Sequence, residues 1–221
     1  MRRTTAGLLA AITVAAVGLA PLVHQADAAL PSHPRLLFSA SDVAGLRARV
    51  TSGVPSQAWT KLKERAEGHL IQAQPEVVRA NVGVPFVLQG LEKPYTLQNQ
   101  MPTYLIDLGM AYQVSGDPRF GRRAIELLDA LGDADYPYWC CQDLGVGDLD
   151  EGLALAYDWT YQLMTPAERT KITADLTSHE GQLLERMLLQ PTHPAARYPT
   201  SNWMGVTAGG AGLLALALKG E

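Results

Sequence analysis

Helical periodicity runs through almost all of the chain after residue 38, and it constrains the fold more than any other feature. Apolar residues recur at spacings of three and four, and short groups of turn residues separate the periodic stretches. Residues 74–98 lack this period, so we expect a loop there with room for a short strand. The spacing predicts helices over residues 39–50, 55–73, 101–115, 118–131, 147–164, 166–189 and 202–218. The predicted fold class is therefore all-α.

Two corners between the predicted helices carry strong turn signals. In residues 115–118 (Ser-Gly-Asp-Pro), Gly suits a left-handed helix cap and Pro suits the start of the next helix. Residues 165–168 (Thr-Pro-Ala-Glu) combine an N-cap, a first-turn Pro and a capping-box Glu. Such corners join antiparallel helices, and we expect the hairpins to stack into an α/α toroid. Its inner ring would consist of the helices at 101–115, 147–164 and 202–218.

The end of the sequence resembles one of these corners. Residues 218–221 (Leu-Lys-Gly-Glu) match the pattern of residues 114–117 (Val-Ser-Gly-Asp), where an inner helix gives way to its outer partner. The pattern predicts a partner helix after Glu221, so we expect the chain to be part of a longer toroid. A complete small helical bundle is the alternative.

The charge and composition exclude two broad classes of protein. The 221 residues include 18 basic and 22 acidic side chains, without a Lys/Arg cluster of the kind that nucleic-acid binding requires. With 47% hydrophobic and 18% charged residues, the chain does not have the composition of a disordered protein. We therefore expect a globular protein that binds no nucleic acid.

The first 28 residues have the pattern of a signal peptide. Arg2 and Arg3 precede an apolar run over residues 6–22, and Ala26-Asp27-Ala28 fits a small-residue cleavage site. Pro21 interrupts the run before it reaches the roughly 20 residues of a membrane span. We expect cleavage after Ala28, a secreted domain at 29–221 and no membrane span in the mature protein. Loss of two arginines and one aspartate changes the net charge from -4 to -5.

Three segments together resemble the heparinase II/III-like polysaccharide lyases. Residues 33–38 (His-Pro-Arg-Leu-Leu-Phe) are similar to the opening of those enzymes. Residues 152–159 (Gly-Leu-Ala-Leu-Ala-Tyr-Asp-Trp), followed by residues 163–169 (Leu-Met-Thr-Pro-Ala-Glu-Arg), resemble their central hairpin. Residues 201–203 (Ser-Asn-Trp), which precede a helix rich in small residues, resemble their cleft-lining Asn motif.

The resemblance implies an N-terminal α/α toroid, a downstream β-sandwich domain and a polysaccharide cleft between them. It also implies β-elimination next to a uronic acid, carried out by an Asn, a Tyr and one or more His residues. The Asn matches Asn202, whereas the family's catalytic Tyr and a further His would lie beyond residue 221. Trp203 stands where some relatives have a His directly after the Asn. This chain would then hold only part of an active site.

The residues around Asn202 have side chains suited to elimination. A neutral amide such as that of Asn202 can hydrogen-bond a uronate and favour its enediolate, although a helix N-cap is the alternative role. Tyr198 can act as base or acid, and Arg197 can bind a carboxylate through two hydrogen bonds. A structural surface loop is the alternative for that pair. Trp203 joins the substrate-binding candidates.

The remaining substrate-binding candidates are aromatic and amide side chains. Tyr136, Tyr138 and Trp139 form the densest aromatic patch, which could stack on sugar rings or cover the core. Gln100, just before the first predicted inner helix, could contact sugar hydroxyls. Since these residues are uncharged, they favour a uronate polymer less charged than a heavily sulfated glycosaminoglycan, such as alginate or a bacterial exopolysaccharide, as the substrate.

Two other functions compete with the predicted lyase activity. Asp148, Asp150 and Glu151 could be the acid and base of a glycoside hydrolase, although acidic residues also favour a first helical turn. A non-catalytic carbohydrate-binding toroid is the second rival.

Two short motifs bear on disulfides and metals. The pair at 140–141 (Cys-Cys) favours two thiols over a vicinal disulfide, and the pair at 179–180 (His-Glu) lacks a second His at ligand spacing. We expect neither a metal nor a cofactor.

Overall fold

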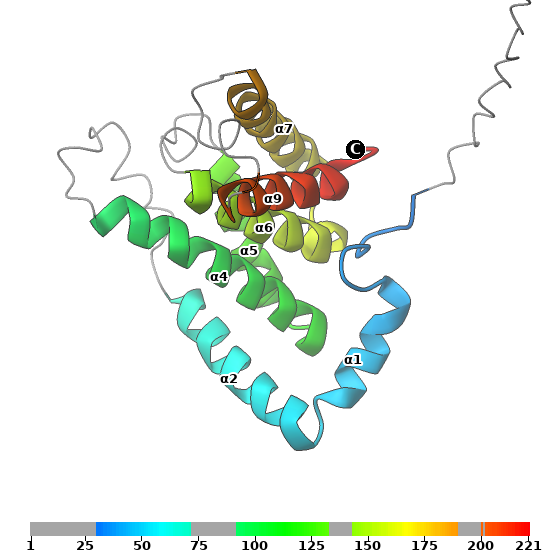
Figure 1. Ribbon diagram of the computed structural model, residues 1–221. Coiled ribbons are helices and arrows are strands. Elements are labelled where there is room, and N and C mark those ends of the chain that lie inside the picture. The colour runs from blue at the N-terminus through cyan, green and yellow to red at the C-terminus, as the bar shows by residue number, and fades with distance from the viewer. Residues whose placement is uncertain (1–29, 72–91, 133–142, 190–199, 201) are drawn as a thin grey trace, which may run out of the picture. The chain divides into compact units, whose positions relative to one another are not determined.

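The computed structural model describes residues 30–71, 92–132, 143–189, 200 and 202–221 (Figure 1). Residues 31–221 form one compact unit, Pro31–Glu221. Its elements are η1 Ala40–Asp42, α1 Val43–Arg49, α2 Gly53–Leu70, α4 Glu92–Ser115, α5 Pro118–Gly132, α6 Asp143–Thr160, η4 Tyr161–Leu163, α7 Pro166–Leu189 and α9 Asn202–Leu218. The described residues contain helices and no strand, so the all-α prediction is confirmed.

Helices α4 and α6 begin four or more residues earlier than the sequence predicts. Helix α4 starts at Glu92, so the expectation of a loop up to residue 98 is wrong for residues 92–98. Pro94 contributed to that expectation, but it falls in the first helical turn, where its missing N–H has no intrahelical partner to lose. Helix α6 likewise starts at Asp143 rather than near residue 147. Gln100 therefore lies within α4 and not before it.

Both predicted corners have the expected local geometry. Gly116 adopts a left-handed φ of 74°, and its N–H donates to the carbonyl of Tyr112 over 2.7 Å. At the other corner, Thr165 N–H donates to Glu168 over 2.7 Å, and Glu168 N–H donates to the Thr165 hydroxyl over 3.2 Å, which completes a capping box. Gly220 has a φ of 88°, so the last corner shares the left-handed glycine of the first.

Helices α4, α6 and α9 lie side by side and form what we call the first layer (Figure 1). A Cβ on Gly152 of α6 would lie 2.6 Å from Cα of Pro102 in α4, and one on Gly109 of α4 would lie 3.1 Å from the Trp159 ring. Because the contacts advance in the same direction along both helices, α4 and α6 are parallel.

The contact between α6 and α9 depends on glycine. A Cβ on Gly210 of α9 would lie 2.1 Å from the carbonyl oxygen of Gly147 in α6, so only glycine allows this backbone approach. At the other end of the same two helices, Arg35 bridges Asp158 and Ala217. From the first contact to the second, the residue numbers rise in both helices, so α9 is parallel to α6. All three helices of the first layer therefore begin at the same end.

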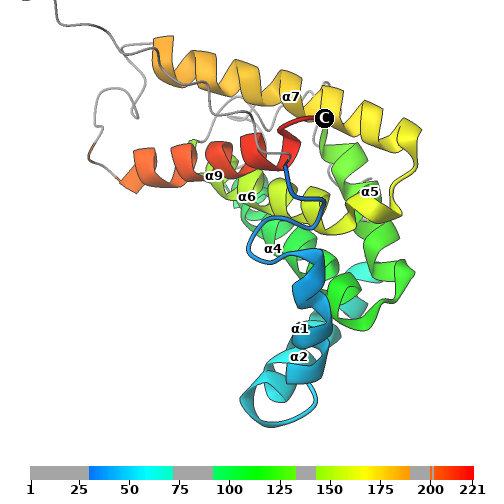
Figure 2. The ribbon, with the colours of Figure 1, turned by 90° about the vertical axis from the view of Figure 1, so that its right-hand side faces the viewer.

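Helices α5 and α7 form a second layer (Figure 2). Arg122 pairs with Glu168 over 2.9 Å and Lys171 pairs with Asp129 over 2.7 Å, so these two helices are parallel to each other. The tight corners at residues 115–118 and 161–166 make each of them antiparallel to the first-layer helix before it. Helix α2 packs on α4 in the antiparallel sense, since Arg65 meets Asp107 and His69 meets Tyr104.

The core lies between the layers and consists of large apolar and aromatic side chains. Trp159 and Tyr157 of α6 and Phe120 of α5 are almost completely buried, together with many leucines of α4, α5 and α6. Burial, with Glu221 and Tyr161 nearby, raises the pKa of Tyr157 to about 12, although a hydrogen bond to Thr173 acts in the opposite direction. Among the described helices, none is both long and apolar enough to cross a membrane.

Candidate functional site

The two ends of the first layer differ in chemistry, and residues 33–36 close one of them. The carboxylate of Asp158, in the last turn of α6, accepts hydrogen bonds from the backbone N–H of Arg35 over 2.9 Å and of Leu36 over 2.9 Å. It also lies 2.5 Å from Nδ1 of His33. Asp158 is 1% exposed, so these donors compensate the burial of its charge.

His33 connects the start of this unit to its last residue. Its Nε2 lies 3.1 Å from the Glu221 carboxylate, whose other oxygen accepts a hydrogen bond from the Tyr161 hydroxyl over 2.6 Å. The His33 ring stacks on Tyr161 with 4.1 Å between centroids. Both ring nitrogens face carboxylate oxygens, which only accept hydrogen bonds, so a doubly protonated imidazolium satisfies both contacts. We call His33, Arg35, Asp158, Tyr161 and Glu221 the His33 cluster.

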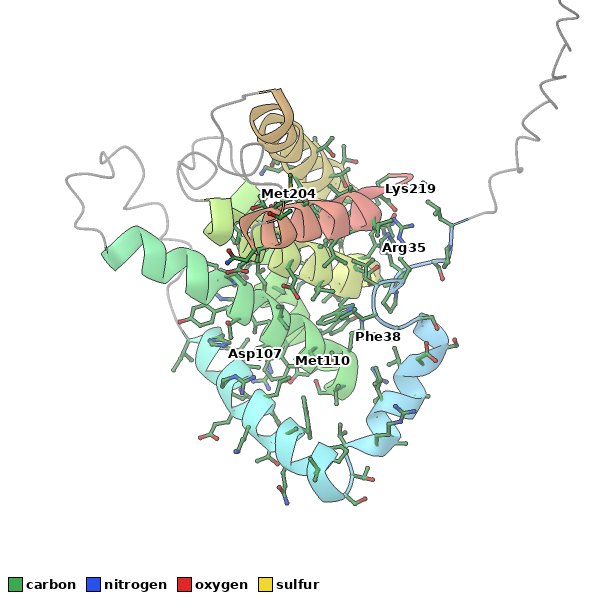
Figure 3. The ribbon with its side chains drawn as sticks, in the orientation of Figure 1. Arg35, Phe38, Asp107, Met110, Met204 and Lys219 are labelled. Atoms are coloured by element: carbon green, nitrogen blue, oxygen red, sulfur yellow. The ribbon has the colours of Figure 1, made fainter. Side chains whose placement is uncertain are left out.

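Side-chain donors cap the C-terminal carbonyls of the first-layer helices. Arg35 donates from Nη2 to the carbonyls of Ala217 and Lys219 at the end of α9, each over 2.8 Å (Figure 3). Arg47 donates to the carbonyl of Gln113 near the end of α4 over 2.9 Å, and Gln113 donates in turn to the carbonyl of Trp159 in α6. These donors satisfy carbonyls that lack intrahelical partners. The contacts at this end of the first layer therefore stabilise the fold.

The N-terminal end of the first layer carries the predicted site. Asn202 is the first residue of α9 and is exposed, so its side chain is accessible to solvent. It shares the exposed face of α9 with uncharged small residues, Gly205, Gly209 and Gly212, together with Leu216. A polar amide at the start of an otherwise uncharged exposed face is a group that can contact a ligand.

The three parallel helices also give this end a common electrostatic character. Each helix N-terminus carries about half a positive charge from its aligned peptide dipoles and presents unpaired N–H groups. Because α4, α6 and α9 are parallel, all three N-termini lie at the end that holds Asn202. The dipoles therefore favour negative charge at this end, where Glu92 and Asp143 occupy the first positions of α4 and α6.

Most of the other predicted site residues fall outside the described residues or lack described side chains. Tyr136, Tyr138 and Trp139 lie in residues 133–142, and Arg197 and Tyr198 lie in residues 190–199. These segments lead directly into α6 and α9. The backbones of Trp203 and Gln100 belong to α9 and α4, but their side chains are not described. The Cys pair at 140–141 also lies outside the described residues.

The rival carboxylates of α6 do not share one environment. Asp150 is completely buried, Asp148 is half-buried and Glu151 is exposed. A hydrolase acid and base must both reach the sugar. Asp150 cannot do so while it is buried, so its position matches a structural role. Within the part of the chain that the structure describes, no group of three or more His, Cys, Asp or Glu residues could hold a metal ion.

The sequence did not reveal the role of Asp158 and His33, which it included only as parts of the resemblance. One signal was present, because an Asp inside the apolar run Leu153–Trp159 must either be buried with partners or break the apolar face. No family model matches the chain, and no curated protein matches it.

Proposed function

We propose that this chain is the helical part of a secreted polysaccharide lyase that acts by β-elimination on a uronic-acid polymer. The observation that carries the proposal is the exposed Asn202 at the end of the first layer where three helix N-termini gather. The opposite end is capped by arginine and glutamine side chains, which leaves the Asn202 end for function.

In the proposed reaction, the C5–H and C4–O bonds of the sugar break and a C4=C5 double bond forms. The Asn202 amide donates a hydrogen bond to the uronate carboxylate, which makes the C5 proton more acidic, and the helix N-termini stabilise the developing enediolate charge. Tyr198, which precedes Asn202 by four residues in the sequence, is the candidate to take the C5 proton, and an acid returns a proton to the leaving oxygen. Further catalytic groups, a Tyr and a His, come from a longer parent chain.

The arrangement of the helices supports the proposed toroid. Three parallel helices form the first layer, and the antiparallel α5 and α7 support them from one side. The outward face of α9 is exposed and uncharged, with Leu216 55% exposed. In a toroid this face receives the next inner helix, as Gly147 of α6 receives α9.

The proposed substrate is a uronate polymer less charged than a heavily sulfated glycosaminoglycan, such as alginate. A lyase for heavily sulfated chains needs many Lys and Arg side chains to pair with sulfate. The net charge of the whole chain is -4, and the segments that lead into α6 and α9, residues 133–142 and 190–199, contain Arg197 as their one Lys or Arg. Helix dipoles and amides, which attract one carboxylate at a time, fit the lower charge density.

The test compares the parent protein and an Asn202→Ala variant on alginate, hyaluronan and heparin at low ionic strength. We expect the parent protein to produce ultraviolet absorbance from the new double bond on alginate, and we expect Asn202→Ala to lose it. The control variant Glu126→Gln, on the second layer, should keep the absorbance of the parent protein. Reducing ends released without absorbance would indicate a hydrolase, and binding without either product would indicate a carbohydrate-binding protein. A strong preference for heparin would contradict the substrate proposal.

A further inference from the structure

A second polar cluster lies between α2 and α4. The guanidinium of Arg65 donates two hydrogen bonds to the Asp107 carboxylate, over 2.7 Å and 2.6 Å, and Nε2 of His69 lies 3.3 Å from the same carboxylate. Asp107 lies on the side of α4 that faces α2 (Figure 3). Burial acts to raise the pKa of Asp107, but the hydrogen bonds from Arg65 and His69 outweigh it and hold the pKa below its ordinary value.

These contacts define the protonation pattern of His69. An ionised carboxylate only accepts hydrogen bonds, so Nε2 of His69 carries the proton that points to Asp107. In the neutral ring Nδ1 is then an acceptor, and no described residue donates to it. The side chain is 9% exposed, so this acceptor is buried without a partner. Such groups are rare in proteins because burial removes their hydrogen bonds to water.

Tyr104 covers the ring of His69. The two ring centroids are 3.9 Å apart and the rings are tilted by 42°. Tyr104 is itself half-buried, and the Arg65 side chain is 51% exposed. Helix α2 ends one residue after His69, at Leu70, and the next residue, Ile71, is 87% exposed. The cluster is therefore close to the surface, and a ligand can reach the buried Nδ1 only if neighbouring side chains move.

The cluster also has a defined relation to the proposed site. Because α2 is antiparallel to α4, its C-terminal end with His69 lies toward the end of the first layer that carries Asn202. Helices α6 and α9 follow α4 in that layer, and packed helices are about 8–10 Å apart. His69 and Asn202 are thus separated by at least two helix spacings, roughly 16–20 Å. One sugar cannot contact both residues, but a polymer can.

We propose that the seam between α2 and α4 is a remote saccharide-binding subsite in which Nδ1 of His69 accepts a hydrogen bond from a sugar hydroxyl. This inference rests on the proposed function. A hydroxyl fits because Nδ1 needs a donor, whereas a carboxylate offers only acceptors. Since Asp107 already balances Arg65, the subsite requires no acidic group. The Tyr104 ring offers an apolar surface to the sugar face.

The probe is an alginate hexasaccharide, titrated into the 29–221 chain labelled with nitrogen-15 histidine. The variant His69→Gln keeps a donor for Asp107 and removes the imidazole ring with Nδ1, and its amide oxygen is an acceptor at a different position. Its missing resonance assigns Nδ1 of His69 in the parent spectrum. We expect the hexasaccharide to shift this resonance, and we expect affinity to fall about 5- to 10-fold in His69→Gln, the effect of one buried hydrogen bond.

Two results would overturn the subsite. An unchanged Nδ1 resonance at saturating hexasaccharide would show that the atom gains no partner. Equal affinity in the parent chain and a folded His69→Gln variant would show that the acceptor contributes nothing. If the variant does not fold, the ring nitrogens are assigned in the parent spectrum by through-bond correlation along the chain, and the Nδ1 resonance then decides. A shifted resonance without lyase product in the parent protein would keep the subsite and refute the lyase proposal. Lyase product without the shift would keep the lyase proposal and refute the subsite.

Discussion

Replacing Asp158 by Asn tests whether the buried carboxylate of the His33 cluster holds the first layer together. The substitution keeps the size of the side chain and removes its charge. The carboxylate accepts from the backbone N–H groups of Arg35 and Leu36 and lies against Nδ1 of His33. The Oδ2 oxygen accepts from both N–H groups, so an amide oxygen at that position keeps these two hydrogen bonds. The NH₂ group then replaces Oδ1, and the charged contact to Nδ1 of His33 is lost.

The expected loss of stability follows from those contacts. Asp158 and His33 form a buried pair, and removal of one partner from such an ion pair costs about 3–5 kcal/mol. The effect is large beside a total stability of about 5–15 kcal/mol for a typical domain.

The assay is urea unfolding of residues 29–221, followed by circular dichroism. With a slope of about 2 kcal/mol per molar urea, the midpoint should fall by about 1.5–2.5 M. The control is Asp129→Asn, which removes a pair with Lys171 from a carboxylate that is 46% exposed. It should cost less than about 1 kcal/mol. If Asp158→Asn costs no more than this control, the His33 cluster does not stabilise the fold.

Two further predictions concern helix packing and ionisation. Gly210→Ala should lower the free energy of unfolding by about 3 kcal/mol, since its Cβ would lie 2.1 Å from the Gly147 carbonyl oxygen. Gly212 has open space around it, so Gly212→Ala should raise the free energy of unfolding by about 0.5–1 kcal/mol in the same urea experiment. Tyr157 should titrate near pH 12 in an absorbance titration, and a Tyr157→Phe variant should lack that late step. Because its folded pKa is above the ordinary value of about 10, the stability contributed below pH 10 should be lost as pH rises from about 10 to 12.

The helices could be predicted because their signals are local. The Gly and Pro at residues 115–118, and the capping box at residues 165–168, fix their corners through contacts within a few residues. The start of α4 at Glu92 could not be predicted, because residues 92–98 lack an apolar period. Their helix extends a segment whose stability comes from later contacts, such as Pro102 against Gly152.

The His33 cluster could not be predicted because its contacts are between residues far apart in the chain. His33 meets Asp158 and Glu221, so no periodicity or turn signal could pair them. The resemblance placed residues 33–38 and 152–159 in one family without indicating that they touch. The position of Asn202 was accessible to prediction, because an Asn before an uncharged run of small residues marks a helix start.

The opposite chemistry of the two ends of the first layer follows from its parallel direction. Parallel helices place all their unpaired carbonyls at one end and all their unpaired N–H groups at the other. At the carbonyl end, Arg35, Arg47 and Gln113 supply donors, and the buried Asp158 fixes the segment that carries Arg35. At the N–H end the accessible Asn202 begins α9, and the acidic Glu92 and Asp143 begin α4 and α6. Variants of Asp158 should therefore change stability, whereas Asn202→Ala should change ligand binding and leave the urea midpoint nearly unchanged.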